Sequence, residues 1–228
     1  MKVTSHGQNL VKITRFGAVN GFLVREDDGF TLVDALVPGS ADGILGAARQ
    51  QGAPIVRIAL THAHADHIGS VDALAERLAD VEVLISARDA RFLRGDKSLD
   101  PGEQKGKARG SYKATRTQPT RTLGAGERVG SLEVVPAPGH TPGHVAFLDT
   151  RDRTLIAGDA YCTLGGTATS AKVSRRFPLV FLGTWHPPTA LQTARELRAL
   201  EPTRLAVGHG PVVEAPGREM DAAIAKAS

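Results

Sequence analysis

The sequence is poor in cysteine and in long apolar runs, and each shortage excludes a class of protein. A single cysteine, Cys162, among 228 residues excludes an internal disulfide framework and favours a reducing compartment. No apolar run approaches the roughly 20 residues that a membrane-spanning helix requires. The polar stretch 1–10 has no signal-peptide core. We therefore expect a cytoplasmic protein without a membrane partner.

The overall composition is that of an ordinary globular protein. Hydrophobic residues make up 41% and charged residues 23%, which excludes a disordered or fibrous chain. The formal net charge of +4 is weak evidence for an anionic partner in a chain of this size. Length and composition predict one domain over residues 1–228.

Short apolar segments between glycine and aspartate turns predict two similar halves, each with strands first and then alternating helices and strands. In the first half we expect strands at 10–14, 21–25, 30–34, 55–60 and 81–85, with helices at 41–51, 70–79 and 87–93. In the second half we expect strands at 133–136, 145–149, 154–157 and 204–207, with helices at 189–200 and 219–227. The pattern indicates an α+β protein whose halves pack sheet against sheet, with helices outside.

The segment 94–121 differs from the rest of the chain, because it holds eight basic and three acidic residues with scattered glycine and proline. A long loop inside a compact domain is typically a lid, a binding segment or a mobile region. A solvated surface loop, a lid over a site and a dimer contact are all open interpretations. If the segment faces a site, Lys105, Lys107 and Arg109 would favour a carboxylated substrate.

The segment 61–67, Thr-His-Ala-His-Ala-Asp-His, concentrates side chains that bind metals. His62, His64, Asp66 and His67 directly follow the strand predicted at 55–60. Neutral imidazole and carboxylate groups suit zinc, iron or manganese. Packing three imidazoles beside an acid without an ion would cost desolvation and mutual repulsion. The segment therefore predicts a metal site.

Three further donor candidates lie at the ends of predicted strands, beside glycine residues that allow a tight turn. His140 lies in the segment 139–144, Asp159 follows the strand at 154–157, and His209 follows the strand at 204–207. Since donors at several strand ends converge on one edge of a sheet, we expect these three to join the first motif.

In this order, the motif His62-x-His64-x-Asp66-His67, the His140 segment, Gly158-Asp159 and Gly208-His209-Gly210 resemble those of the metallo-β-lactamase-fold hydrolase superfamily. The resemblance spans residues 62–209, and the leading strands extend it to nearly the whole chain. It implies a four-layer αβ/βα sandwich of two mixed sheets flanked by helices, with a binuclear metal site at one edge. It also implies the ligands: His62, His64 and His140 for one ion, Asp66, His67 and His209 for the other, with Asp159 bridging both. Asp34 matches the acid that usually braces such a site, or is simply a strand-end turn residue.

Two adjacent divalent ions would hold a hydroxide ready at neutral pH to attack a carbonyl carbon. Asp66, which would border that hydroxide, is the expected proton shuttle. Zinc is the expected metal, with manganese and iron as alternatives.

Other polar residues near the motifs have two open roles each. His144 either braces a loop or binds metal, and Tyr161 either polarises a carbonyl or is structural. Trp185 and His186 either form a pocket wall or cap the following helix. Cys162 lacks a visible activating neighbour, which predicts a structural role.

The resemblance narrows the activity to that of a compact, lactonase-like or glyoxalase-II-like hydrolase. Glyoxalase-type thioesterases typically add a C-terminal thiol-binding region, for which the stretch after His209 is short. We expect hydrolysis of a small ester, lactone or thioester, with a small-molecule substrate and a homodimer as a further expectation. A phosphodiesterase or nuclease of the same fold and a β-lactamase-like activity are the alternatives, although a nucleic-acid partner is disfavoured.

Overall fold

The strands of the computed structural model, which describes residues 1–104 and 107–228, form two mixed main sheets. The first sheet follows chain order: β1 (Lys2–His6), β2 (Leu10–Arg15), β3 (Val19–Glu26), β4 (Gly29–Val33), β5 (Ile55–Ala59), β6 (Glu82–Ser86) and β7 (Arg121–Leu123). The second sheet has the order β15 (Val213–Glu214), β14 (Arg204–Ala206), β11 (Thr154–Ile156), β10 (Val145–Asp149), β9 (Leu132–Pro136) and β8 (Arg128–Val129). A separate ribbon pairs β12 (Tyr161–Cys162) with β13 (Ala168–Thr169).

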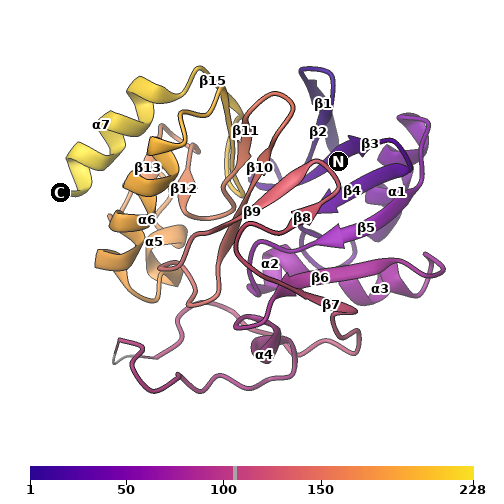
Figure 1. Cartoon of the computed structure of the whole chain (residues 1–228), viewed down its shortest axis with the longest axis horizontal. Coiled ribbons are helices and arrows are strands. Elements are labelled where there is room, and N and C mark those ends of the chain that lie inside the picture. Colours follow the sequence, from indigo (N-terminus) through magenta and orange to yellow (C-terminus); the bar gives the residue numbers. More distant parts are fainter. Residues whose placement is uncertain (105–106) are drawn as a thin grey trace.

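Helices cover the outer faces of both sheets, so the molecule has four layers (Figure 1). The helices are α1 (Ala41–Gln50), α2 (Ala65–Ile68), α3 (Val71–Ala75), α4 (Ala90–Leu93), α5 (Leu179–Gly183), α6 (Pro187–Ala199) and α7 (Gly217–Ala227). Helices α1 and α3 lie outside the first sheet, and α6 and α7 lie outside the second. The predicted α+β fold class and four-layer sandwich are confirmed.

Three apolar cores separate the four layers. Successive side chains of a strand point to opposite faces. In β3, Phe22 and Val24 therefore enter the core between the sheets, whereas Leu23 enters the core beneath the helices of the first half. The third core joins the second sheet to α6 and α7 through residues such as Leu197 and Met220. Both sheets share the central core, the arrangement expected of a single domain over 1–228.

The observed elements differ from the predicted ones mainly at the edges of the sheets. The helix predicted at 70–79 is confined to Val71–Ala75, and the one predicted at 87–93 begins at Ala90. The edge strand β1 was not expected, because its sequence is polar and its residues are exposed or half-buried. Among the described residues, no helix has both the length and the hydropathy needed to cross a bilayer.

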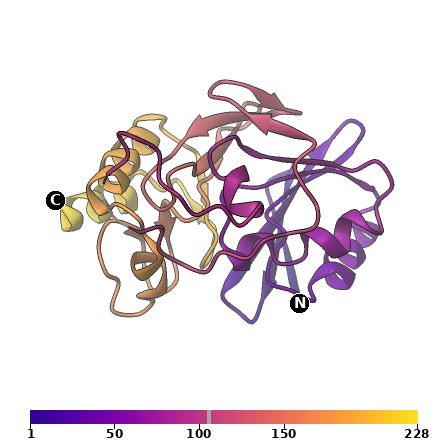
Figure 2. The ribbon, with the colours of Figure 1, turned by 90° about the horizontal axis from the view of Figure 1, so that it is seen from below.

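The strand order places the predicted donors at one edge. Strands β4, β5 and β6 are parallel, so the chain leaves all three at the same edge of the first sheet. Strand β9 is antiparallel to β10, β10 is antiparallel to β11, and β11 is parallel to β14. Strands β9, β11 and β14 therefore also end together. Figure 2 shows the chain that follows α4 and the chain that leads into β7 running across this edge.

Candidate metal centre

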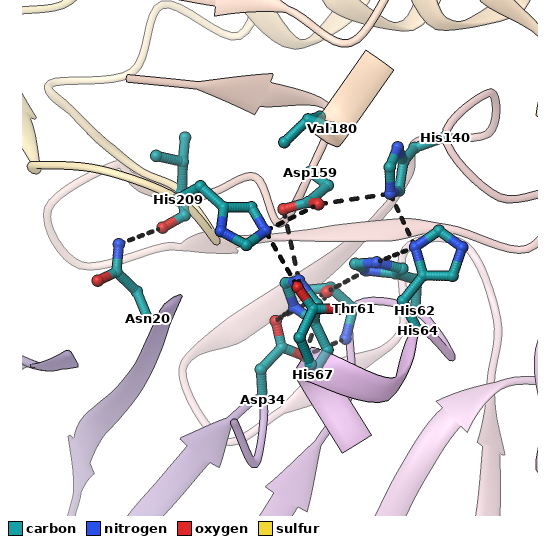
Figure 3. A network of polar contacts seen from close by, with 12 residues as sticks. Asn20, Asp34, Thr61, His62, His64, His67, His140, Asp159, Val180 and His209 are labelled. Atoms are coloured by element: carbon teal, nitrogen blue, oxygen red, sulfur yellow. Dashed lines mark hydrogen bonds and ion pairs between the residues drawn. The ribbon is translucent and has the colours of Figure 1, made fainter. Parts of the chain in front are cut away.

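The structure brings all seven predicted donors together between the two halves. Figure 3 shows the histidines of this set together with Asp159. Donor atoms lie within 4.8 Å of one another in each of three groups: His62, His64 and His140; Asp66, His67 and His209; and His62, His67 and Asp159. Asp159 lies between the first two groups, because its Oδ2 is 3.4 Å from His140 Nε2 and 3.3 Å from His209 Nε2. This arrangement has the two sets and the central carboxylate that the resemblance implies.

Hydrogen bonds at the outer nitrogen of each ring fix which nitrogen faces the centre. His64 Nε2 donates to the Arg109 carbonyl oxygen at 2.9 Å, so its Nδ1 lone pair points inward. Thr184 Oγ1 donates to the Val180 carbonyl and therefore accepts from His140 Nδ1, at 3.0 Å. This bond leaves the His140 Nε2 lone pair facing the centre.

The same rule holds for the remaining three rings of the centre. Thr61 Oγ1 donates to Asp34 and so accepts from His62 Nδ1 at 3.0 Å. His67 Nδ1 donates to Asp34 Oδ2 at 2.8 Å, and His209 Nδ1 donates to the Ala18 carbonyl at 3.2 Å. All five rings therefore turn Nε2, or Nδ1 in His64, toward the centre, and in the neutral form each of these nitrogens would offer an electron pair, as in metal-binding imidazoles.

Two buried atoms of the seven donors have no hydrogen-bond partner within residues 1–104 and 107–228. They are His67 Nε2 and Asp159 Oδ1, which lie 3.5 Å apart. Meanwhile, the inward nitrogens of His62 and His140 lie only 3.2 and 3.0 Å from His64 Nδ1. Converging lone pairs and orphaned buried atoms are unfavourable unless a cation lies between them. The donor set therefore fits divalent metal ions.

The charges divide the centre into a neutral and an ionic side. Burial lowers the pKa of His62 and His140 well below its usual range, so both rings are neutral at pH 7. On the other side, burial acts to lower the pKa of His209, but the carboxylates of Asp159 and Asp66 outweigh it and raise this pKa to about 9. Metal binding on this side must therefore displace protons.

Asp66 is the most accessible of the seven donors. Its side chain is 36% exposed, whereas the Asp159 side chain is 4% exposed. Burial acts to raise the pKa of the Asp66 carboxyl, but the neighbouring His67 and His209 rings hold it below its usual range. Asp66 is thus a carboxylate that contacts both the centre and solvent.

Asp34 braces the centre, and its side chain has the role that the resemblance implied. Its backbone has φ = 62°, a left-handed conformation that is uncommon outside glycine. From this position the carboxylate accepts bonds from the Thr61 backbone N–H, the Thr61 hydroxyl and His67 Nδ1. It therefore connects the end of β4 to the motif that follows β5.

Asp89 is a buried residue of the centre that the sequence analysis did not identify. Its Oδ2 accepts bonds from the Ala63 N–H at 3.1 Å and the Thr141 hydroxyl at 2.7 Å, and its Oδ1 accepts from the Gly143 N–H at 2.8 Å. It thus ties the His62–His67 loop to the His140 loop across the two halves. The sequence signal that could have identified Asp89 is its position three residues after β6, at the same edge of the sheet as Asp34.

We expect Asp89 to make stability depend on pH. Burial raises the pKa of its carboxyl from 3.8 to about 6, so the folded state keeps the proton more firmly than the unfolded state does. This contribution to stability is complete below about pH 4 and is lost as the pH rises through about 6, a fall of about 3 kcal/mol. In urea titrations, Asp89→Asn should remove this fall in the free energy of unfolding. The exposed substitution Asp221→Asn should retain it, and identical pH profiles for Asp89→Asn and wild type would contradict the assignment.

The basic segment 94–121 lies against the centre through its backbone. Besides the bond between His64 and the Arg109 carbonyl, the Ser111 carbonyl accepts from the Ala65 N–H at 2.7 Å, and the Tyr112 ring lies 4.7 Å from the His64 ring. Gly110, with φ = +94°, has no room for a side chain, since a Cβ would overlap the His64 ring. Lys105 lies outside the described residues.

The structure decides between the two roles of His144, Tyr161 and His186, and it also bears on the role predicted for Cys162. His144 Nε2 accepts from the Asp159 backbone N–H at 3.1 Å, so it braces the loop. The Tyr161 hydroxyl donates to the Ala194 carbonyl at 2.6 Å inside the third core, away from the centre. His186 is the N-cap of α6 and accepts from the Thr189 N–H. Cys162 is buried, and burial raises the pKa of its thiol to about 11, which fits a structural role.

Comparison with known proteins identifies relatives over most of the chain. A family model described as the metallo-beta-lactamase superfamily matches residues 14–209. The uncharacterized protein YobT of Bacillus subtilis (strain 168) is 44% identical over 100% of this chain and 99% of its own length. The probable metallo-hydrolase YflN of the same organism is 30% identical over 82% of this chain and 78% of its own length.

This chain is also similar to a hydrolase and to a solved structure. The hydroxyacylglutathione hydrolase of Xanthomonas axonopodis pv. citri (strain 306) is 34% identical over 63% of this chain, which spans 46%, about half, of that relative's length. The crystal structure of TTHA1623 in a di-iron-bound form has a TM-score of 0.67 at 26% identity, covering 90% of this chain and 94% of that one.

Proposed function

Because the chain belongs to the metallo-beta-lactamase superfamily and is a metallo-hydrolase, we propose that it cleaves a small ester, lactone or thioester using two divalent metal ions. His62, His64 and His140 would hold one ion, Asp66, His67 and His209 would hold the other, and Asp159 would contact both. The observation that carries the proposal is the convergence of five imidazole nitrogens and two carboxylates on one centre. Two of these buried donor atoms, His67 Nε2 and Asp159 Oδ1, have no hydrogen-bond partner among the described residues.

When bound, such ions supply a water of lowered pKa and positive charge beside the substrate's carbonyl oxygen. Hydrolysis would join the oxygen of this water to the carbonyl carbon and break the bond from that carbon to the leaving oxygen or sulfur. Asp66, the donor most open to solvent, would accept one proton of the water and deliver it to the leaving atom. The products are a carboxylic acid and an alcohol or thiol, which remain joined when a lactone opens.

The donor chemistry supports zinc, with manganese and iron as alternatives. A di-iron form is known for the similar protein TTHA1623, which supports including iron. We further propose a cytoplasmic location, on the basis of the unpaired, buried Cys162. The contacts of segment 94–121 with His64 support its proposed role as a cover over the site, whereas the dimer contact stays a prediction.

Metal analysis of the purified protein, combined with a substrate panel, tests the proposal. We expect about two ions per chain and hydrolysis of at least one class among neutral lactones, esters and thioesters. Phosphodiesters and β-lactams are the comparison arms. If the protein binds metal but hydrolyses only phosphodiesters, or only β-lactams, the proposed reaction is wrong and that activity takes its place. A protein that binds no divalent metal would contradict the proposal outright.

A further inference from the structure

A cleft of about 570 Å³ opens onto the candidate metal centre. This volume lies within the roughly 300–1,000 Å³ of small-molecule sites. Apart from the predicted donors, its lining in the described part of the chain is apolar or glycine, with Ser111 as the one polar side chain. Val19 and Pro38 line it from the first half, and residues at and just before α5 line it from the second.

The α5 wall of the cleft exposes large apolar side chains to solvent. Leu179 is 62% and Leu182 is 58% exposed, and both line the cleft. Deeper in, Phe177 lies 5.0 Å from the His209 ring, and the nearly buried Val180 points toward Asp159 (Figure 3). A contiguous apolar surface beside a polar centre is typical of a binding site for an apolar group.

Helix α5 is coupled directly to the centre. Thr184, the residue that ends α5, donates to the Val180 carbonyl at 2.8 Å while accepting from His140 Nδ1 at 3.0 Å. One hydroxyl therefore fixes both the apolar wall and a predicted ligand. A group held against this wall is thereby placed at a fixed distance from the reacting carbonyl, which is how binding contributes to rate.

Away from the metal centre, the described lining of the cleft holds no basic side chain that could pair with an anionic group. No lysine or arginine lines it within residues 1–104 and 107–228. Two basic side chains of segment 94–121 form ion pairs away from the cleft, Arg116 with Glu76 and Arg121 with Glu127. A substrate carboxylate held against the α5 wall would lose its hydration with no lysine or arginine of the described residues to pair with it.

From these observations we infer that the acyl side of the substrate is an uncharged alkyl chain that lies along α5, so the enzyme prefers medium-chain neutral acyl compounds to short or carboxylated ones. This inference rests on the proposed function, because it assumes that the centre cleaves the bond at the carbonyl end of the chain. It replaces the expectation that Lys107 and Arg109 select a carboxylated substrate.

Hydrolysis of a homologous ester series tests the inference. With 4-nitrophenyl acetate, butyrate, hexanoate and octanoate, kcat/KM should rise by up to about fourfold for each added methylene that enters the cleft. The kcat/KM for a matched hemisuccinate ester should be lower than that for the butyrate ester. A flat or falling series, or a preference for the hemisuccinate, would overturn the inference while leaving the proposed function intact.

Substitutions in the wall locate the effect. In Leu179→Asn/Leu182→Asn, the ratio of kcat/KM for octanoate to that for acetate should fall by about tenfold or more. The matched control Val173→Asn removes an apolar side chain that is 51% exposed outside the cleft, and it should keep the wild-type ratio. An unchanged ratio in the double variant would contradict the placement of the chain along α5.

A binding measurement separates this inference from the proposed reaction. In saturation-transfer NMR of the purified protein, 1-octanol should bind more strongly than 1-butanol, and the double variant should abolish the difference. If no ester is cleaved but octanol binds in this way, the proposed function fails and the apolar subsite stands. If octanol does not bind, the inference fails whatever the protein hydrolyses.

Discussion

Removing the metal ions with a chelator is expected to abolish hydrolysis and to lower the melting temperature by about 10 °C. The loss of activity follows because Asp66 and the other donors have no means of activating water by themselves. The loss of stability follows because a ligand at about 1,000 times its Kd contributes about 4 kcal/mol, and each kcal/mol shifts the melting temperature of a domain of this size by about 2–4 °C. Calorimetry and an activity assay on the same sample measure both effects.

Addition of zinc, manganese or iron to the depleted protein should restore both properties together. The variant His6→Gln, which changes a histidine on β1 outside the centre, should respond to the chelator as the wild type does. A depleted protein that keeps both its activity and its melting temperature would contradict a metal centre at these residues.

Replacement of Asp66 by asparagine is expected to lower kcat by about 10²- to 10³-fold, the usual contribution of a positioned proton donor or acceptor. The amide keeps the shape of the side chain but cannot carry a proton to the leaving atom. The loss should therefore depend on the leaving group. An alkyl ester, whose alkoxide must be protonated, should lose more than a 4-nitrophenyl ester, whose leaving group departs as an anion.

Steady-state kinetics on the two esters, with the metal content measured alongside, separate this role from a loss of metal. Asp221→Asn on α7, where Asp221 pairs with Arg198, is the matched control and should leave both rates unchanged. If Asp66→Asn lowers the two rates by the same factor, in step with metal content, Asp66 is a ligand without a role in proton transfer.

The architecture and the cluster of donors were predictable because they depend on local patterns at strand ends. The segment 55–60, apolar except for Arg57 and followed closely by His62 and His64, specifies a strand and its loop together. Elements that depend on pairing partners rather than on their own residues were not predictable. The two-residue strands β8, β12, β13 and β15 carry too little periodicity to be seen.

The partners that orient the donors were also largely invisible in the sequence. Backbone carbonyls of Arg109 and Ala18 hold His64 and His209, and a backbone group carries no residue signature. Thr184 bonds to His140, which lies 44 residues away in the chain. Asp89 bonds to Thr141, which lies 52 residues away. Only the fold brings such groups together. Asp34 was predictable because a resemblance supplied its position.

Two chain segments from opposite halves meet beside His209. The Asn20 side chain, at the start of β3, donates to the carbonyls of Val207 at 2.9 Å and Gly210 at 2.7 Å. Val19 and His209 pair as an isolated bridge. Since the first half supplies His62 to His67 and the second supplies the rest, neither half can build the centre by itself. The complete set of donors therefore exists only after both halves have docked, so the retention of bound ions would report how accurately the halves have joined.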